Sequence, residues 1–211
     1  MKHYTNENIV PTAFLRDVYS NKERWVSYYH QIKLVKDLIK SGTVLEVGIG
    51  NGVVAKYLDS LYEVKTVDII KELNPDYVAS VEDLGLLADN SVDVSLCAEV
   101  LEHLPFDKFS KCLSELRRVS KDYVVISLPY WGYTFGFRAR LPYFGSKTIK
   151  FKVSGVKPHQ FKGQHYWEIG KRGFSLKTIK KSIQDSGLHV LKSFWDLDDP
   201  YHYYFVLKII K

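Results

Sequence analysis

A glycine-rich turn and a carboxylate that follows it are the residues of this 211-residue chain best suited to bind a ligand. Gly48, Gly50 and Gly52 fall within five residues, directly after an apolar run. Glycine has no Cβ atom, so this backbone can approach a ligand closely. Asp68 ends the next apolar run, 62–67, where its carboxylate can accept hydrogen bonds from both hydroxyls of a ribose. Together they predict a nucleoside-containing cofactor at the carboxyl ends of parallel strands.

The charge beside the turn discriminates between cofactors. Glu46 precedes the turn by two residues, so it would repel a pyrophosphate and attract a sulfonium or an ammonium group. A dinucleotide fingerprint also needs a third glycine at the position that Val53 occupies. Both features favour S-adenosylmethionine over NAD.

The stretch EVGIGNG, from Glu46 to Gly52, resembles motif I of the class I S-adenosylmethionine-dependent methyltransferases, in particular the type 11-like group. The resemblance implies an α/β, Rossmann-like fold with a seven-stranded, mostly parallel sheet, an antiparallel last strand, helices on both faces and an insertion after strand five. It implies one such domain over residues 1–211, with an N-terminal helical cover at 1–40 and a substrate lid at 130–173. The cofactor-binding residues it implies are Glu46, Gly48, Gly50, Asn51, Gly52, Asp68, Ile69, Val81, Glu82, Asp83, Cys97 and Ala98.

A second motif, at 93–104, ends in Glu-Val-Leu-Glu-His-Leu and resembles the family's motif IV with the residues after it. The resemblance brings Cys97 and Ala98 to the methionine half of the cofactor, where their backbone carbonyls would accept from its ammonium. It brings the turn at Glu82 and Asp83 to the adenine, whose amino group either carboxylate could bind. The sequence does not rank these two carboxylates.

Acid–base groups follow the second motif. If a helical turn begins after Ala98, Glu99, Glu102 and His103 share one face, and two carboxylates with an imidazole can hold a divalent cation. Some family members bind metal through a similar Glu-x-x-Glu-His pattern, which would make His165 a fourth ligand. Metal-free relatives keep the pattern, and there His103 would be a general base or a substrate hydrogen-bond partner. We therefore expect His103 and His165 to be catalytic residues and leave the metal open, together with a merely structural role for His103.

Composition and charge limit the compartment and the partners. The chain has two cysteines without metal-ligand spacing, no signal-peptide pattern and no apolar run of about 20 residues, so we expect a cytoplasmic protein without a transmembrane segment. Residues 138–181 carry twelve Lys and Arg against one acid, Glu168. The net charge of +6 therefore belongs to this basic segment, and the remainder is net acidic.

Hydrophobic spacing predicts the elements that position these residues. Apolar residues at three- and four-residue intervals predict helices, and continuous apolar runs predict buried strands. The predicted helices are 21–40, 53–58, 106–119 and 175–186, with a short turn at 69–73. The predicted strands are 44–47, 62–67, 77–81, 92–97, 123–128, 188–194 and 203–210, the last two antiparallel. Residues 130–173 have weak periodicity and are predicted to be irregular.

These features predict an S-adenosylmethionine-dependent methyltransferase, with O-methylation of a small-molecule or sugar acceptor as the leading hypothesis. The lysines and aromatic residues of 130–173 would suit an acceptor that is anionic or polar. Segment 157–170 also resembles methyltransferases of bacterial or archaeal surface-polysaccharide gene clusters. An RNA methyltransferase that uses the basic segment is the alternative, because cations interleaved with aromatics suit nucleic acid. A catalytically silent, cofactor-binding partner subunit is the third hypothesis.

Overall fold

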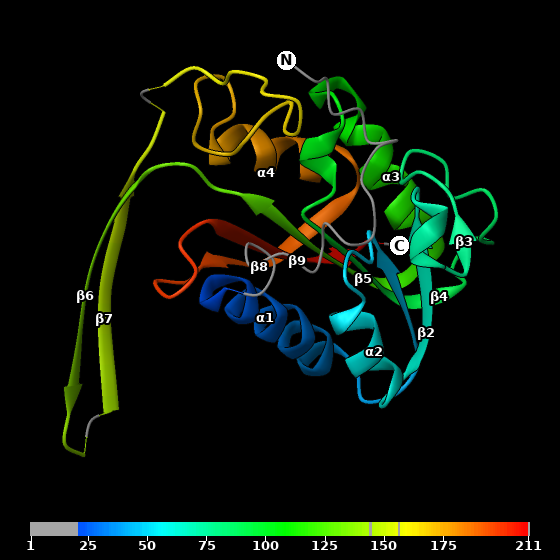
Figure 1. The fold of residues 1–211 in the computed structure, drawn as a ribbon, viewed down its shortest axis with the longest axis horizontal. Coiled ribbons are helices and arrows are strands. Elements are labelled where there is room, and N and C mark those ends of the chain that lie inside the picture. The colour runs from blue at the N-terminus through cyan, green and yellow to red at the C-terminus, as the bar shows by residue number, and fades with distance from the viewer. Residues whose placement is uncertain (1–20, 144, 156, 211) are drawn as a thin grey trace.

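The computed structural model describes residues 21–143, 145–155 and 157–210, and its centre is a seven-stranded sheet of order β3-β2-β1-β4-β5-β9-β8 (Figure 1). The strands β1 to β5 are parallel, and β9 runs antiparallel to both of its neighbours. The predicted fold class is therefore confirmed. The strand bounds are β1 (Thr43–Val47), β2 (Glu63–Asp68), β3 (Tyr77–Val78), β4 (Val92–Ala98), β5 (Ser120–Pro129), β8 (Leu188–Trp195) and β9 (His202–Ile209).

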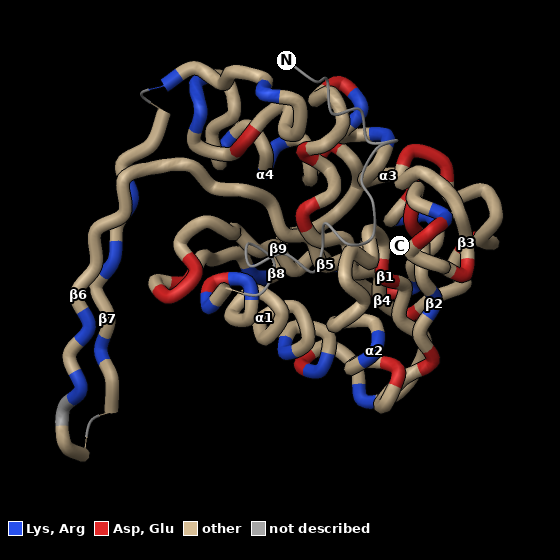
Figure 2. Tube along the Cα trace, in the orientation of Figure 1, with Lys and Arg blue, Asp and Glu red and all other residues tan. Residues whose placement is uncertain are grey.

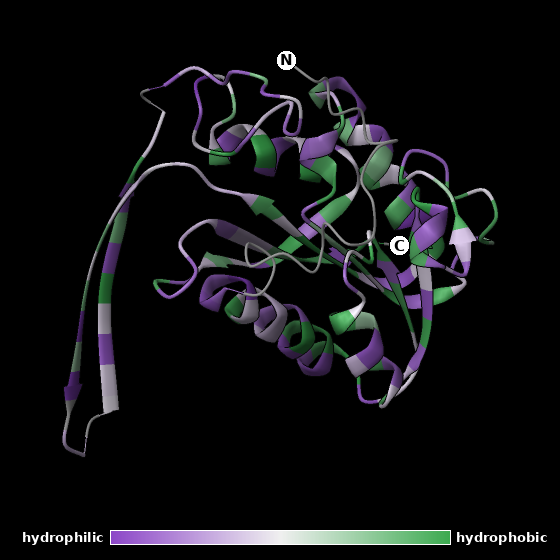
Figure 3. Ribbon diagram, viewed as in Figure 1, coloured by the Kyte–Doolittle hydropathy of each residue, from purple (hydrophilic) through white to green (hydrophobic). Residues whose placement is uncertain are grey.

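Helices cover both faces of the sheet (Figure 1). On one face, α1 (Lys22–Leu38) and α2 (Val53–Asp59) pack against alternate strand residues in one apolar cluster. On the other, α3 (Phe109–Val119) and α4 (Leu176–Asp185) join a second cluster. Figure 3 shows the hydrophobic residues gathered along the strands between these helices. Short 3-10 helices η4 (Lys71–Leu73), η5 (Leu101–His103) and η6 (Phe106–Lys108) lie in the connections.

The predicted helices and strands of the sheet region agree with the structure to within a few residues. The main shortfall is β3, which was expected to reach residue 81 and ends at Val78. The chain turns instead, because the backbone N–H of Asp83 donates to the carbonyl of Ser80 at 3.0 Å. The turn leaves Val81 buried and Asp83 exposed.

The prediction of irregular structure throughout 130–173 is wrong for its first half. Strands β6 (Tyr133–Leu141) and β7 (Gly145–Val153) form an antiparallel hairpin that projects from the body (Figure 1). Large apolar residues recur at every second position from Tyr133 to Phe137 and from Ile149 to Val153, a period of two that is typical of a strand. The remaining residues, 154–173, contain no helix or strand in the described part and lie against the body.

The predicted N-terminal helical cover is present as α1 within residues 21–40, while residues 1–20 lie outside the described residues. Asn21 caps this helix, because its side chain accepts a hydrogen bond from the backbone N–H of Arg24 at 2.8 Å. In the described parts of the chain no helix is long and apolar enough to cross a membrane.

Candidate active site

The glycine turn forms a backbone cradle between β1 and α2. Gly48, Gly50 and Gly52 all have positive φ, at 82°, 52° and 71°, a region that side chains other than glycine rarely adopt. A Cβ atom on Gly48 would lie 2.2 Å from Cγ2 of Val100. The Val100 side chain therefore occupies the space that a Cβ atom on Gly48 would need, and only glycine fits at this position.

Glu46 places a buried carboxyl group, with one oxygen unpartnered in the described structure, beside the cradle. It is only 5% exposed, and its Oε2 has no hydrogen-bond partner among the described residues. Burial raises the pKa of Glu46 to about 8, and a backbone hydrogen bond from Ala55 offsets only part of that effect. A buried acid with an unpaired oxygen fits a cationic ligand, such as the ammonium and sulfonium of S-adenosylmethionine.

Asp68 ends β2 as predicted, and its carboxylate is already tied to the cradle. One oxygen accepts from the backbone N–H of Ile49 at 3.0 Å and the other from that of Ile70 at 2.9 Å. Burial raises the pKa of this carboxyl. Each oxygen retains a second lone pair, so the ribose role stays a prediction, and a structural role in holding the loop is added to it.

The other predicted cofactor residues line the same edge of the sheet. The side-chain amide of Asn51 donates to the Tyr28 hydroxyl at 2.8 Å and thereby connects the cradle to α1. Ile69 follows Asp68 and is half exposed, which leaves an apolar surface next to the predicted ribose position. Glu82 lies 3.7 Å from the ammonium of Lys108, and Asp83 accepts from the backbone of Gly85 at 3.0 Å. Their order as adenine partners therefore stays open.

Cys97 and Ala98 close strand β4 next to the cradle, because Cys97 pairs with Val47 of β1. The thiol is fully buried, and this burial raises its pKa well above the usual value. The sulfur is therefore protonated at neutral pH and is not a nucleophile. What the strand offers a ligand is its backbone and the small Ala98 side chain.

The expected helical turn after Ala98 is wrong, because Glu99 is left-handed at φ 55° and the 3-10 helix η5 begins only at Leu101. Glu99 therefore does not share a helix face with Glu102 and His103. Its carboxylate turns toward β5 and β9, where Oε1 accepts from the Ser127 hydroxyl at 3.0 Å. A non-glycine residue in this region costs free energy and is held in place by its surroundings.

Three of the predicted groups do converge: Glu102, His103 and His165 each offer a ligand atom, and these atoms lie within 4.8 Å of one another. The two imidazole rings meet edge to face with centroids 4.9 Å apart. Glu102 is fully buried, and neither of its carboxylate oxygens has a hydrogen-bond partner among the described residues. Burial and the nearby charge of Glu99 raise the pKa of Glu102 well above its usual value.

The hydrogen bonds of the two histidines fix their tautomers. His103 Nδ1 lies 3.2 Å from the carbonyl oxygen of Gln164, and because a carbonyl only accepts, the proton sits on Nδ1. His165 Nδ1 lies 3.1 Å from a carboxylate oxygen of Glu168 in the same way. Burial and the neighbouring His165 lower the pKa of His103 to about 4. At neutral pH, Nε2 of His103 is therefore an unprotonated acceptor.

A buried polar chain behind Glu99 was not predicted. His202 Nε2 lies 3.4 Å from Oε2 of Glu99, and its Nδ1 lies 2.6 Å from a carboxylate oxygen of Asp199, which also accepts from the Tyr204 hydroxyl. Burial lowers the pKa of His202, but the two carboxylates raise it more, so the net shift is upward. These residues are a hundred positions from Glu99, and no local pattern marks them.

The second half of the predicted lid contributes to this site. Segment 164–167 is bound to the loop after β4, because Tyr166 N donates to Glu102 O at 2.8 Å and Trp167 Nε1 donates to Leu104 O at 3.1 Å. The rings of Phe161 and Tyr166 pack together beside it, with centroids 4.5 Å apart. The aromatic residues of the hairpin take no part, because they project from the body with β6 and β7.

A comparison with protein families finds a match in the middle of the chain. Residues 45–126, from β1 to β5, match the family model described as a methyltransferase domain. A search of curated proteins by sequence finds no match. The match contains the glycine cradle, Asp68 and the Glu99–His103 segment.

Solved structures agree with this family. A SAM-dependent methyltransferase from Aquifex aeolicus is 18% identical over 96% of this chain and 100% of its own, with a TM-score of 0.61. The 1,6-didemethyltoxoflavin-N1-methyltransferase of Burkholderia thailandensis, solved with S-adenosylhomocysteine, is 14% identical over 95% and 87%, with a TM-score of 0.63. The N-methyltransferase NodS of Bradyrhizobium japonicum, also solved with S-adenosylhomocysteine, is 8% identical over 90% of this chain and 89% of its own, with a TM-score of 0.61. These identities carry the fold alone, which is that of S-adenosylmethionine-dependent methyltransferases, and the family match identifies residues 45–126 as a methyltransferase domain.

Proposed function

We propose that this methyltransferase acts on a hydroxyl oxygen of a small-molecule or sugar acceptor bound at Glu102, His103 and His165. The observation that carries the proposal is the neutral His103 imidazole, whose proton is held at Nδ1 and whose Nε2 is free to accept another. A neutral hydroxyl is a weak nucleophile and needs a base to take its proton as the oxygen attacks, whereas a neutral amine is nucleophilic enough to attack first and lose its proton afterwards. A site with converging proton acceptors therefore favours O-methylation.

We further propose that the cofactor lies on the glycine cradle with its positive charges toward Glu46 and its ribose toward Asp68. When bound, S-adenosylmethionine supplies a methyl group already activated on its sulfonium. The work left to the protein is to align the acceptor oxygen with the sulfur–methyl bond and to accept its proton at Nε2 of His103. The Gln164 carbonyl holds the imidazole in the tautomer that this step requires.

The walls of the site support this acceptor class. Phe161, Tyr166 and Tyr201 are each partly exposed near the two histidines, and the Tyr201 hydroxyl lies 3.4 Å from His165 Nδ1. Aromatic faces with polar edges suit the C–H faces and hydroxyls of a sugar or a similar polar ring. The exposed Lys157 and Lys162 in the same segment favour an acceptor that carries negative charge.

A metal-assisted version of the same reaction is a second candidate, and one observation favours it. Both histidines use Nδ1 for a carbonyl or carboxylate partner, which is the arrangement that outer-shell partners give to metal-binding histidines. Glu102 would be the third ligand, because both of its oxygens are unpartnered among the described residues. A divalent cation there would lower the pKa of the acceptor hydroxyl in place of a base.

The test is methyl transfer from labelled cofactor into a metabolite extract, followed by identification of the labelled product. We expect an O-methylated polar compound, full loss of labelling in His103→Ala, and activity that survives a chelator if His103 is the base. Loss of activity with chelator and its return with a divalent metal would select the metal version. Labelled RNA, an N-methylated product, or labelling only after a second methyltransferase-like chain is added would each refute the proposal.

A further inference from the structure

The hairpin β6–β7 has one apolar face, set by its register. Five cross-strand pairs lie on that face, and the three nearest the body have large apolar members: Tyr133 with Val153, Phe135 with Phe151, and Phe137 with Ile149. Ala139 with Lys147 and Leu141 with Gly145 continue the same face to the tip. The rings of Phe135 and Phe151 stack with centroids 5.0 Å apart. The six large apolar side chains are between 44% and 73% exposed.

The opposite face of the hairpin is basic, and its inner half is bound to the body. Arg138 donates to Asp198 at 2.7 Å in the turn between β8 and β9, and Lys152 donates to the carbonyl of Tyr130 at 2.9 Å. A Cβ atom on Gly136 would meet the side chain of Leu197 at 2.4 Å. Because this face contacts the acidic turn (Figure 2), the apolar face points away from the body.

The apolar face of this hairpin is left largely uncovered by the described residues. A two-stranded hairpin is marginally stable in water unless a third strand or a packed face supports it. No third strand pairs with β6 or β7 in the described residues, so both outer edges carry unpaired backbone groups. A contiguous exposed apolar face of this kind marks a surface that another molecule covers.

We propose that the apolar face of the hairpin packs against the same face of a second copy of this chain. The six side chains would remove roughly 600 Å² per chain, if each contributes about 100 Å², or about 1,200 Å² in total. That area is at the low end of stable interfaces, and a two-fold arrangement would use one patch twice. The basic residues lie mostly on the opposite face, so this packing keeps the positive charges of the two copies apart.

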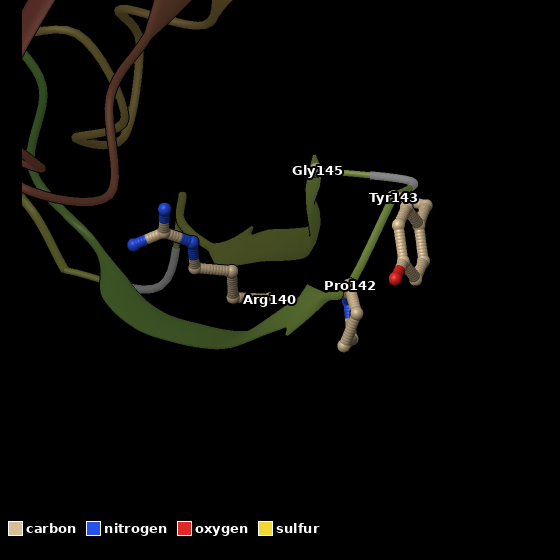
Figure 4. Close-up of a pocket in the computed structure, with 4 residues that line it drawn as sticks. All are labelled: Arg140, Pro142, Tyr143 and Gly145. Carbon is tan, nitrogen blue, oxygen red and sulfur yellow. The ribbon is translucent and has the colours of Figure 1, made fainter.

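Other occupants fit less well. A bilayer core cannot satisfy the unpaired backbone groups at the two edges of the hairpin. A single-stranded nucleic acid needs cations and aromatic rings on one face, whereas here the register separates them. The open hollow of about 430 Å³ at the tip of the hairpin is lined by Arg140, Pro142, Tyr143 and Gly145, and none of these residues is buried (Figure 4).

The test is the mass of the full chain in solution by sedimentation across a concentration series. We expect a dimer of twice 24.4 kDa. Phe137→Lys should raise the dimer dissociation constant by about 30-fold or more, because it puts a charge into the centre of the interface. Ser146→Lys is the matched control, since it adds the same charge on the opposite face and should change the constant less than about 3-fold. Circular dichroism and affinity for the demethylated cofactor product report whether each variant is folded.

Disulfide trapping keeps the proposal testable if Phe137→Lys does not fold. Both native cysteines are buried, so a single new cysteine reports only on its own surroundings. Among variants with one cysteine at 135, 137, 149 or 151, at least one should form a covalent dimer under mild oxidation, and Ser146→Cys should not. A wild-type chain that stays monomeric at 100 µM would overturn the proposal. Sedimentation with phosphatidylserine vesicles or binding of RNA by that monomer would then point to another occupant of the face. A folded Phe137→Lys variant that dimerises as the wild type does would also overturn it.

Discussion

Cofactor binding should release a proton from Glu46, and this prediction can be worked from the structure. In the free protein the pKa of Glu46 is about 8, because the carboxyl is buried and one of its oxygens has no partner among the described residues. A bound ammonium and sulfonium would favour the ionised carboxylate and lower that pKa. At pH 7 the free carboxyl is about nine-tenths protonated, so binding should release about 0.9 proton per chain.

The same linkage sets the pH dependence of the affinity. Below the pKa, the carboxyl must first lose a proton, so the affinity for the demethylated cofactor product should rise with pH and level off above pH 8. A pKa of about 8 corresponds to a rise of about 50-fold between pH 6 and pH 8. Calorimetry in buffers of different ionisation enthalpy measures the released proton directly, and calorimetry across this pH range measures the affinity.

The control is Glu46→Gln, which keeps the shape of the side chain and removes its titration. This variant should bind more weakly at pH 8 and should show neither proton release nor a rise in affinity with pH. If the wild type released no proton and its affinity did not change between pH 6 and pH 8, Glu46 would not face the cofactor's charge. An equal pH dependence in Glu46→Gln would assign the titration to another group.

Three further predictions concern the predicted site residues. Asp68→Ala should weaken cofactor binding by about 1.5–3 kcal/mol in calorimetry, because ribose hydrogen bonds and the loop contacts to Ile49 and Ile70 are lost; an unchanged Kd would refute this. His103→Ala should lower kcat by about 10²–10⁴ with little change in cofactor affinity, and full activity of this variant would leave His103 a structural residue. In the wild type, protonation of His103 should not lower kcat until the pH approaches 4. Gly48→Ala should lower the free energy of unfolding by roughly 1–3 kcal/mol from backbone strain alone, which thermal denaturation measures. Adding Val100→Ala should restore only the stability lost through the side-chain clash and not the part lost through strain.

Most of the sheet could be predicted because its residues obey local rules. The run 123–128 is apolar without interruption, as a strand covered on both faces must be, and the structure has β5 over Ser120–Pro129. The class of cofactor could also be predicted from the sequence, because the sign of the charge at Glu46 and the spacing of three glycines need no tertiary information. The family match over 45–126 confirms that part of the interpretation.

Two kinds of feature were not predicted: contacts that only the folded sheet creates, and a strand whose apolar–polar alternation is obscured by lysines and glycines. The alternation of Tyr133, Phe135 and Phe137 with polar residues was available and indicates a strand, but the lysines and glycines between them suggested a loop. The left-handed backbone of Glu99 has no sequence signature. Its approach to His202 depends on β9 lying beside β5, which only the folded sheet brings about.

The most direct test of the central claim is a crystal structure of the chain with bound S-adenosylhomocysteine. We predict that the ligand lies on Gly48–Gly52 with its amino group toward Glu46 and its ribose at Asp68, and that its sulfur faces the space between His103 and His165. A ligand bound elsewhere, or a sulfur turned away from these two histidines, would contradict the proposed acceptor site.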